Sequence, residues 1–173
     1  MLVFDLADGS GLGVLRSPSG VTTGVHVHGD LLVFGCADQA VRVVDLDAGD
    51  VRWTRAVGRV PGPGDLAVVG DRVCIATADG VVVCDRERGE EVGKILGGEP
   101  ALGLQVQAER LFARVSRPAV DSEATHEVLV ALDVVAVDVR WEFGLSGKAP
   151  GPLGIDGVHA AMPTPEGDVV LFR

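Results

Sequence analysis

The chain has 173 residues, of which 47% are hydrophobic and 23% charged, and its formal net charge is −10. This composition predicts a globular protein with a core. It excludes nucleic acid as a natural partner, since Lys and Arg must neutralise phosphates. No apolar run approaches the roughly 18 residues of a membrane span, so we expect no membrane insertion. No signal peptide is recognisable, which predicts a cytoplasmic location for a complete chain and leaves the location of a fragment of a longer protein unknown.

One pattern recurs four times along the chain. Each copy has a strand that ends in Asp, a turn that in three of the four copies has the form Asp-x-x-x-Gly, and a further strand. The aspartates are spaced by 40 residues with one insertion of 8: Asp5, Asp45, Asp85 and Asp133. Trp stands eight residues after the aspartate in two copies, as Trp53 and Trp141. A carboxylate that accepts backbone hydrogen bonds and a left-handed glycine would close each turn, so these acids are interpreted as structural.

A second pattern precedes each copy, in which an alternating strand reaches a Gly-Asp or equivalent turn and another strand follows. Four antiparallel strands in about 40 residues is the size of a β-propeller blade. The predicted fold class is therefore all-β, with about four four-stranded blades. Residues 22–57, 66–96 and 104–143 would be whole blades, and residues 1–15 and 153–173 would be partial ones.

Two segments, residues 104–115 and the turn near Asp79, need a closer look at their secondary structure. The apolar residues of 104–115 also have helical spacing, but their register match to residues 66–77 favours strands, because one repeated unit should adopt one structure. Asp79-Gly80 is predicted as a two-residue hairpin turn, which would set Cys84 opposite Ile75 and so on the other sheet face from Cys74. Together with Cys36, these cysteines are interpreted as small buried hydrophobes.

The run Asp45-x-x-x-Gly49-x-x-x-Trp53, placed after a strand and a hairpin, resembles the repeat of the quinoprotein-like (PQQ-like) β-propellers. The resemblance implies that Trp53 and Trp141 pack between neighbouring blades. Gly89 fits the glycine position, whereas Val137 replaces it in the fourth copy. Three of the four copies therefore keep the glycine.

The predicted strands number one more than four closed blades need, since both chain ends would offer the same strand of a blade. Three arrangements remain open. The chain is a segment of a larger propeller, pairs with a second copy into one ring, or closes alone with one strand displaced.

Two features are candidate sites. His26 and His28 lie on one face of a predicted strand, but two ligands are too few for a closed zinc site, and we interpret them as structural. The insertion in the third whole blade, residues 116–127, is a candidate binding loop, because variable loops on a rigid scaffold are common binding sites. Its polar candidates are Arg117, Asp121, Glu123 and His126.

These observations support two functional hypotheses. The first is a non-catalytic binding or scaffold module for a protein partner, with no cofactor and no metal. The alternative is a segment or remnant of a quinone-dependent dehydrogenase. The family resemblance implies a calcium site with Asn ligands and, in many members, adjacent cysteines for such enzymes, whereas this chain has no Asn and no Cys-Cys pair.

Overall fold

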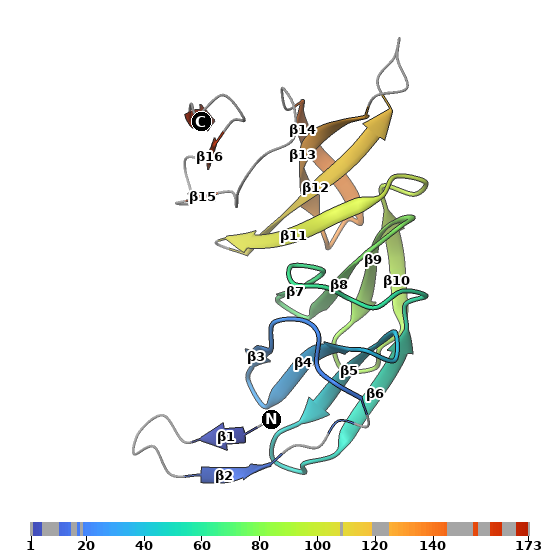
Figure 1. Ribbon diagram of the computed structural model, residues 1–173, viewed down its shortest axis with the longest axis vertical. Coiled ribbons are helices and arrows are strands. Elements are labelled where there is room, and N and C mark those ends of the chain that lie inside the picture. The colour runs from blue at the N-terminus through green and yellow to red at the C-terminus, as the bar shows by residue number, and fades with distance from the viewer. Residues whose placement is uncertain are drawn as a thin grey trace. The chain divides into compact units, whose positions relative to one another are not determined.

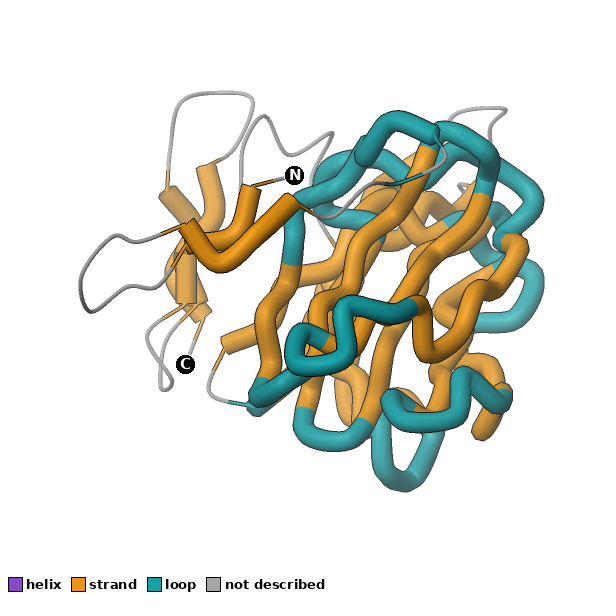
Figure 2. The backbone as a smooth tube through the Cα atoms, turned by 90° about the horizontal axis from the view of Figure 1, so that it is seen from below, coloured by secondary structure: helices purple, strands orange, loops and turns teal. Residues whose placement is uncertain are grey.

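The computed structural model describes residues 2–4, 11–14, 17, 19–107, 109–118, 125–144, 154–155, 160–163 and 169–172. All the regular secondary structure in these residues is β-strand (Figures 1 and 2). Within them, no helix could cross a bilayer. The chain forms two compact units, Met1–Gly62 and Pro63–Arg173, which are treated separately below.

The first unit contains a two-stranded sheet and a four-stranded antiparallel sheet. The two-stranded sheet pairs β1 (Leu2–Phe4) with β2 (Gly11–Val14). The four-stranded sheet follows the chain order, with β3 (His26–His28), β4 (Leu31–Cys36), β5 (Ala40–Asp45) and β6 (Val51–Ala56). Its middle strands are buried on both faces, because β4 and β5 are apolar at almost every position, whereas β6 alternates between half-buried and exposed residues.

The second unit contains two four-stranded antiparallel sheets and a three-stranded one. The strands of the first are β7 (Leu66–Val69), β8 (Arg72–Thr77), β9 (Gly80–Asp85) and β10 (Glu91–Ile95). Those of the second are β11 (Ala101–Gln107), β12 (Arg110–Pro118), β13 (Thr125–Asp133) and β14 (Asp138–Gly144). The third holds β15 (Gly154–Ile155), β16 (Ala160–Pro163) and β17 (Val169–Phe172).

The sheets β7–β10 and β11–β14 pack face to face, and β11 lies against β7 and β8. One continuous apolar core joins them, to which the first sheet contributes small side chains such as Cys74 and Ala76 and the second contributes Leu111, Val115 and Val130. Burying one Val or Leu side chain stabilises the fold by roughly 1.5–3 kcal/mol. Residues 104–107 and 110–115 form strands here, which confirms the choice of strand over helix for this segment.

The turn between β8 and β9 lies one residue earlier than predicted, which shifts the strand pairing by two residues. Thr77 pairs with Gly80, so the turn residues are Ala78 and Asp79, and Cys84 lies opposite Val73 and not opposite Ile75. Gly80 starts β9 with a φ of 105°, a backbone conformation that side chains rarely tolerate. A slip of two residues leaves the face pattern unchanged, so Cys74 and Cys84 still point to opposite faces. All three cysteines are buried free thiols.

Candidate functional site

The hairpin of β12 and β13 is the longest in the described part of the chain. Each of its strands has nine residues, whereas β8 and β9 have six each. Pairing continues without a bulge from Leu111↔Leu132 to Pro118↔Thr125. The insertion predicted from the sequence thus begins as an extension of the sheet, and residues 119–124 lie outside the described residues.

Arg117 lies in the last described pairs of this hairpin, which join residues 116–118 to residues 125–127 and are called its base below. Its Nε donates to Glu99 Oε2 at 3.0 Å, and its Nη2 lies 2.9 Å from Glu142 Oε2. Glu99 stands between β10 and β11, and Glu142 lies on the outer strand β14, so one guanidinium joins three segments. The hydrogen bond to Glu142, followed by the one to Glu99, raises the pKa of Arg117, and Arg117 in turn lowers the pKa of Glu142.

The other face of the hairpin carries a second, looser pair. Arg114 Nη1 lies 3.8 Å from Glu127 Oε2, and Glu127 is buried although it is charged. His126 lies opposite Arg117 in the strand register and is half-buried. Of the four predicted binding-loop residues, Arg117 and His126 therefore sit at the base of the hairpin. Asp121 and Glu123 lie outside the described residues.

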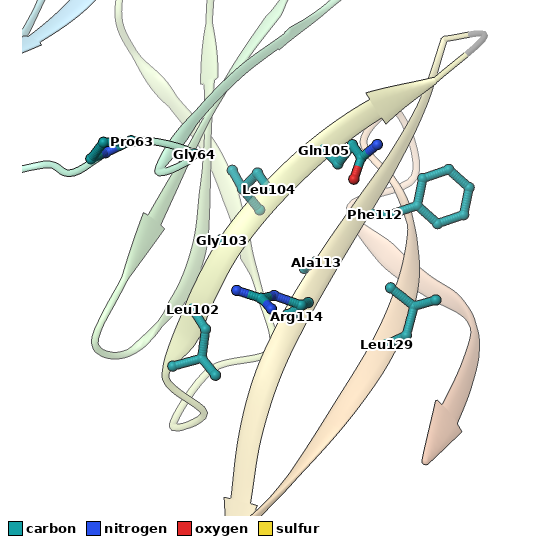
Figure 3. Close-up of a pocket in the computed structure, with 10 residues that line it drawn as sticks. All are labelled: Pro63, Gly64, Leu102, Gly103, Leu104, Gln105, Phe112, Ala113, Arg114 and Leu129. Carbon is teal, nitrogen blue, oxygen red and sulfur yellow. The ribbon is translucent and has the colours of Figure 1, made fainter. Parts of the chain in front are cut away.

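A hollow of about 190 Å³ lies beside this hairpin (Figure 3). In the strand register Gly103 lies opposite Arg114, whose side chain is among those that line the hollow (Figure 3). Gln105 and the apolar residues Leu102, Phe112 and Leu129 also line the hollow. It therefore offers one cation and one amide within a mostly apolar wall.

The aspartates of the repeat are used by their own turns. Asp45 Oδ1 accepts hydrogen bonds from the amides of Asp47 at 3.0 Å and Ala48 at 2.9 Å. Asp85 and Asp133 accept equivalent pairs of amide hydrogen bonds. The amide of the third turn residue and then a nearby arginine lower the pKa of Asp45 and of Asp133. These carboxylates hold turns closed, and Asp5 lies outside the described residues.

The histidines of β3 do not form part of a larger cluster. His26 is half-buried, and this burial lowers the pKa of its imidazole, whereas His28 is exposed. Among the residues that the structure describes, no three His, Cys, Asp or Glu side chains gather as a metal site requires. We therefore assign no metal to this pair.

Trp141 lies on the face of β14 that points away from the core shared with β7–β10. Its ring centroid lies 6.0 Å from that of Phe112 in a tilted arrangement, and 42% of the residue remains exposed. Phe143, on the same strand, is exposed to the same extent. Trp141 and Phe143 therefore expose aromatic surface on this face of the sheet, beside the buried Phe112.

The sequence matches no protein-family model and no curated protein. Solved structures do match it. The computationally designed protein Ika4 has a TM-score of 0.71 at 14% identity, over 93% of this chain and 95% of that one. BamB from Moraxella catarrhalis has a TM-score of 0.67 at 18% identity, over 99% of this chain and 51% of that one.

A third match is the quinohemoprotein alcohol dehydrogenase from Comamonas testosteroni, with a TM-score of 0.59 at 17% identity, over 80% of this chain and 23% of that one. The chain thus spans about half the length of BamB and about a quarter of the dehydrogenase. At these identities the likeness shows the fold, which is that of a partial β-propeller, the class predicted from the repeat.

Proposed function

We propose that this chain is a non-catalytic binding or scaffold module that contacts a protein partner through the β12–β13 hairpin. The observation that carries the proposal is the attachment of the hairpin. Arg117 ties its base to Glu99 and to Glu142, which lie on either side of it. A hairpin whose strands are held in place loses less conformational entropy when it binds than a loose one.

The sequence of the hairpin tip suggests the chemistry of the partner. Asp121 and Glu123 add two negative charges to a chain whose net charge is already −10. The cation at the base, Arg117, is occupied by two carboxylates. We therefore expect a basic protein surface as partner, because complementary charge speeds encounter and suppresses wrong partners.

The fold leaves the alternative function open, since it is shared by BamB and by a quinohemoprotein dehydrogenase. A segment of a quinone-dependent enzyme would bind PQQ together with calcium. Adding both to the purified chain and recording its melting temperature tests this alternative. A rise in melting temperature that requires both ligands would favour the enzyme segment over our proposal. An unchanged melting temperature would favour the binding module.

Site-specific photo-crosslinking in cells of the native host tests the proposal itself. A photo-reactive amino acid replaces Ser122 at the hairpin tip or, as a control, Val135, which is 75% exposed in the β13–β14 turn. We expect a discrete adduct with one protein from position 122, none from position 135, and a lower yield from position 122 when Arg117→Ala loosens the base. Equal adducts from both positions, or none from position 122, would contradict the proposal.

A further inference from the structure

Two departures from the repeat meet at the interface between sheets β7–β10 and β11–β14. The copy in β9–β10 has Gly93 eight residues after its aspartate, where two other copies have Trp. The copy in β13–β14 has Val137 four residues after its aspartate, where the other copies have Gly. Considered singly, each departure loses a feature of the repeat.

The structure brings the two positions together. Gly93 pairs with Val83, whose side chain lies in the core shared by the two sheets, so position 93 faces the neighbouring sheet. A Cβ built on Gly93 would lie 2.7 Å from Val137 Cγ1 and 3.6 Å from both Cβ and Cγ2 of the same residue. Val137 therefore fills the space above Gly93 from the opposite side, and it packs against the shared core.

The backbone at Val137 shows that this position is under strain. Val137 has a φ of 56°, and the glycines at the equivalent positions, Gly49 and Gly89, have φ values of 73° and 70°. A β-branched residue is a rare outlier in this region, because its side chain collides with its own backbone. Such a conformation persists only when the surrounding contacts compensate for its strain.

We infer that Gly93 and Val137 form a matched pair, in which a small residue on one blade makes room for a large residue on the next. This pair determines which blade can pack after which along the chain. The large residue at this interface comes from the turn of the following blade, and the small one from the outer strand of the preceding blade. A tryptophan at position 93 and the valine at position 137 exclude each other. This inference goes beyond the proposed function, because it concerns how the two sheets of the second unit fit together.

A double-mutant cycle tests the matched pair. The variants are Gly93→Trp, Val137→Gly and the two combined, and the melting temperature is followed by circular dichroism. We expect Gly93→Trp to lower the melting temperature by roughly 10 °C or more, and Val137→Gly to lower it by a few degrees. The melting temperature of the double variant should then fall by much less than the sum of the two single losses, because the glycine at position 137 makes room for the tryptophan at position 93. Additive losses would overturn the inference.

Two controls separate packing from other effects. Val135→Gly changes an exposed residue of the same turn, and Val92→Trp adds the same ring to an exposed position of the same strand. The losses of Val135→Gly and Gly93→Trp should therefore add, and so should those of Val92→Trp and Val137→Gly. If either control couples as strongly as the Gly93 and Val137 pair, the coupling is not specific to that contact.

A milder substitution keeps the test valid if Gly93→Trp does not fold. Gly93→Ala adds only the Cβ that meets Val137, so it should destabilise the natural chain but be neutral or stabilising beside Val137→Gly. The buried thiol of Cys74 lies in the shared core, whereas that of Cys36 lies in the first unit. Gly93→Ala should therefore speed thiol labelling at Cys74 several-fold and leave Cys36 unchanged. Equal effects at both thiols, or equal effects of Gly93→Ala in the two backgrounds, would also overturn the inference.

Discussion

The sheets β7–β10 and β11–β14 are two copies of one repeat that differ at their ends. In the first, the β8–β9 hairpin is short, and Gly80 lies so close to the carbonyls of Ile95 and Leu96 that even a Cβ would collide with them. In the second, the corresponding hairpin extends by three residues per strand, and its base is held by the ion pairs of Arg117.

This difference shows which parts of the repeat can vary. Both sheets keep apolar faces toward the shared core and an aspartate that accepts two amide hydrogen bonds in its turn, because these features make the core and close the outer hairpin. The end of the β8–β9 hairpin is held by the close backbone approach at Gly80 and by Asp79. The carboxylate of Asp79 accepts a hydrogen bond from the Gly98 amide at 2.7 Å and lies 2.6 Å from Lys94 Nζ. The described end of the β12–β13 hairpin is held by the ion pairs of Arg117. Longer segments can therefore be accepted in the second sheet without a change to its core.

The largest expected effect comes from the shared core. Leu111 is fully buried between the two sheets, and Leu111→Ala should lower the free energy of unfolding by about 2–5 kcal/mol. Val73 occupies the equivalent position of the repeat and is also fully buried, and Val73→Ala should cost roughly 2 kcal/mol, because fewer methylene groups are removed. Urea denaturation measures both losses. Leu102→Ala is the control, since Leu102 is 41% exposed, and a loss as large as that of Leu111→Ala would refute the assignment of the core.

The next effect concerns the tight hairpin of the first sheet. A Cβ on Gly80 would lie 2.5 Å from the Ile95 carbonyl oxygen and 2.7 Å from that of Leu96, and the φ of Gly80 is 105°. Gly80→Ala should therefore lower the free energy of unfolding by roughly 2–4 kcal/mol. Gly98→Ala is a matched control, because Gly98 also has a positive φ but nothing lies near its missing Cβ. It should cost only about 1–2 kcal/mol. Equal losses in the two variants would mean that backbone strain alone explains the destabilisation by Gly80→Ala.

How far the sequence predicts this fold can be judged at the same two hairpins. The recurrence of Asp85 and Asp133 identified the four-stranded unit, because the turn that each one closes depends on local hydrogen bonds. The turn between β8 and β9 was misplaced by one residue and the strand pairing therefore by two, since Asp79 and Gly80 are both typical turn residues and either position keeps the same residues on each face. Only the close approach of Gly80 to the next strand distinguishes the two.

The candidate site could be predicted only in part. Arg117 was selected because it lies in the insertion, and an insertion is visible in the spacing of the repeat. Its partner Glu99 lies 18 residues away in the sequence, and Glu142 lies on another strand. Pairing between side chains on different strands depends on packing, which one sequence does not reveal. The presence of Glu99 in a Gly- and Pro-rich connection beside the insertion was the one available signal.

A smaller effect is expected at the ion pairs of the long hairpin. Arg117→Ala should lower the melting temperature by roughly 2–3 °C, because partly exposed ion pairs contribute little to stability. The larger consequence should be local, as faster amide hydrogen exchange at residues 116, 117 and 125–127. Arg117→Lys keeps the charge but loses the planar fork and should give an intermediate result. Unchanged exchange in Arg117→Ala would show that the base of the hairpin does not depend on this residue.

The smallest effect is expected from the titration of Asp133. The amide of Ala136, followed by the side chain of Arg140, lowers the pKa of this carboxyl in the folded state. The ionised form therefore stabilises the fold above the ordinary pKa of an aspartate, about 3.9, and this contribution is lost as the pH falls through the lower folded value. Asp133→Asn should be less stable than the natural chain at pH 7, and the difference should shrink below about pH 4. Melting temperatures recorded from neutral to acidic pH measure this difference. A difference that does not change with pH would mean that Asp133 acts through hydrogen-bond geometry alone, and that its charge and the pair with Arg140 contribute nothing to the turn.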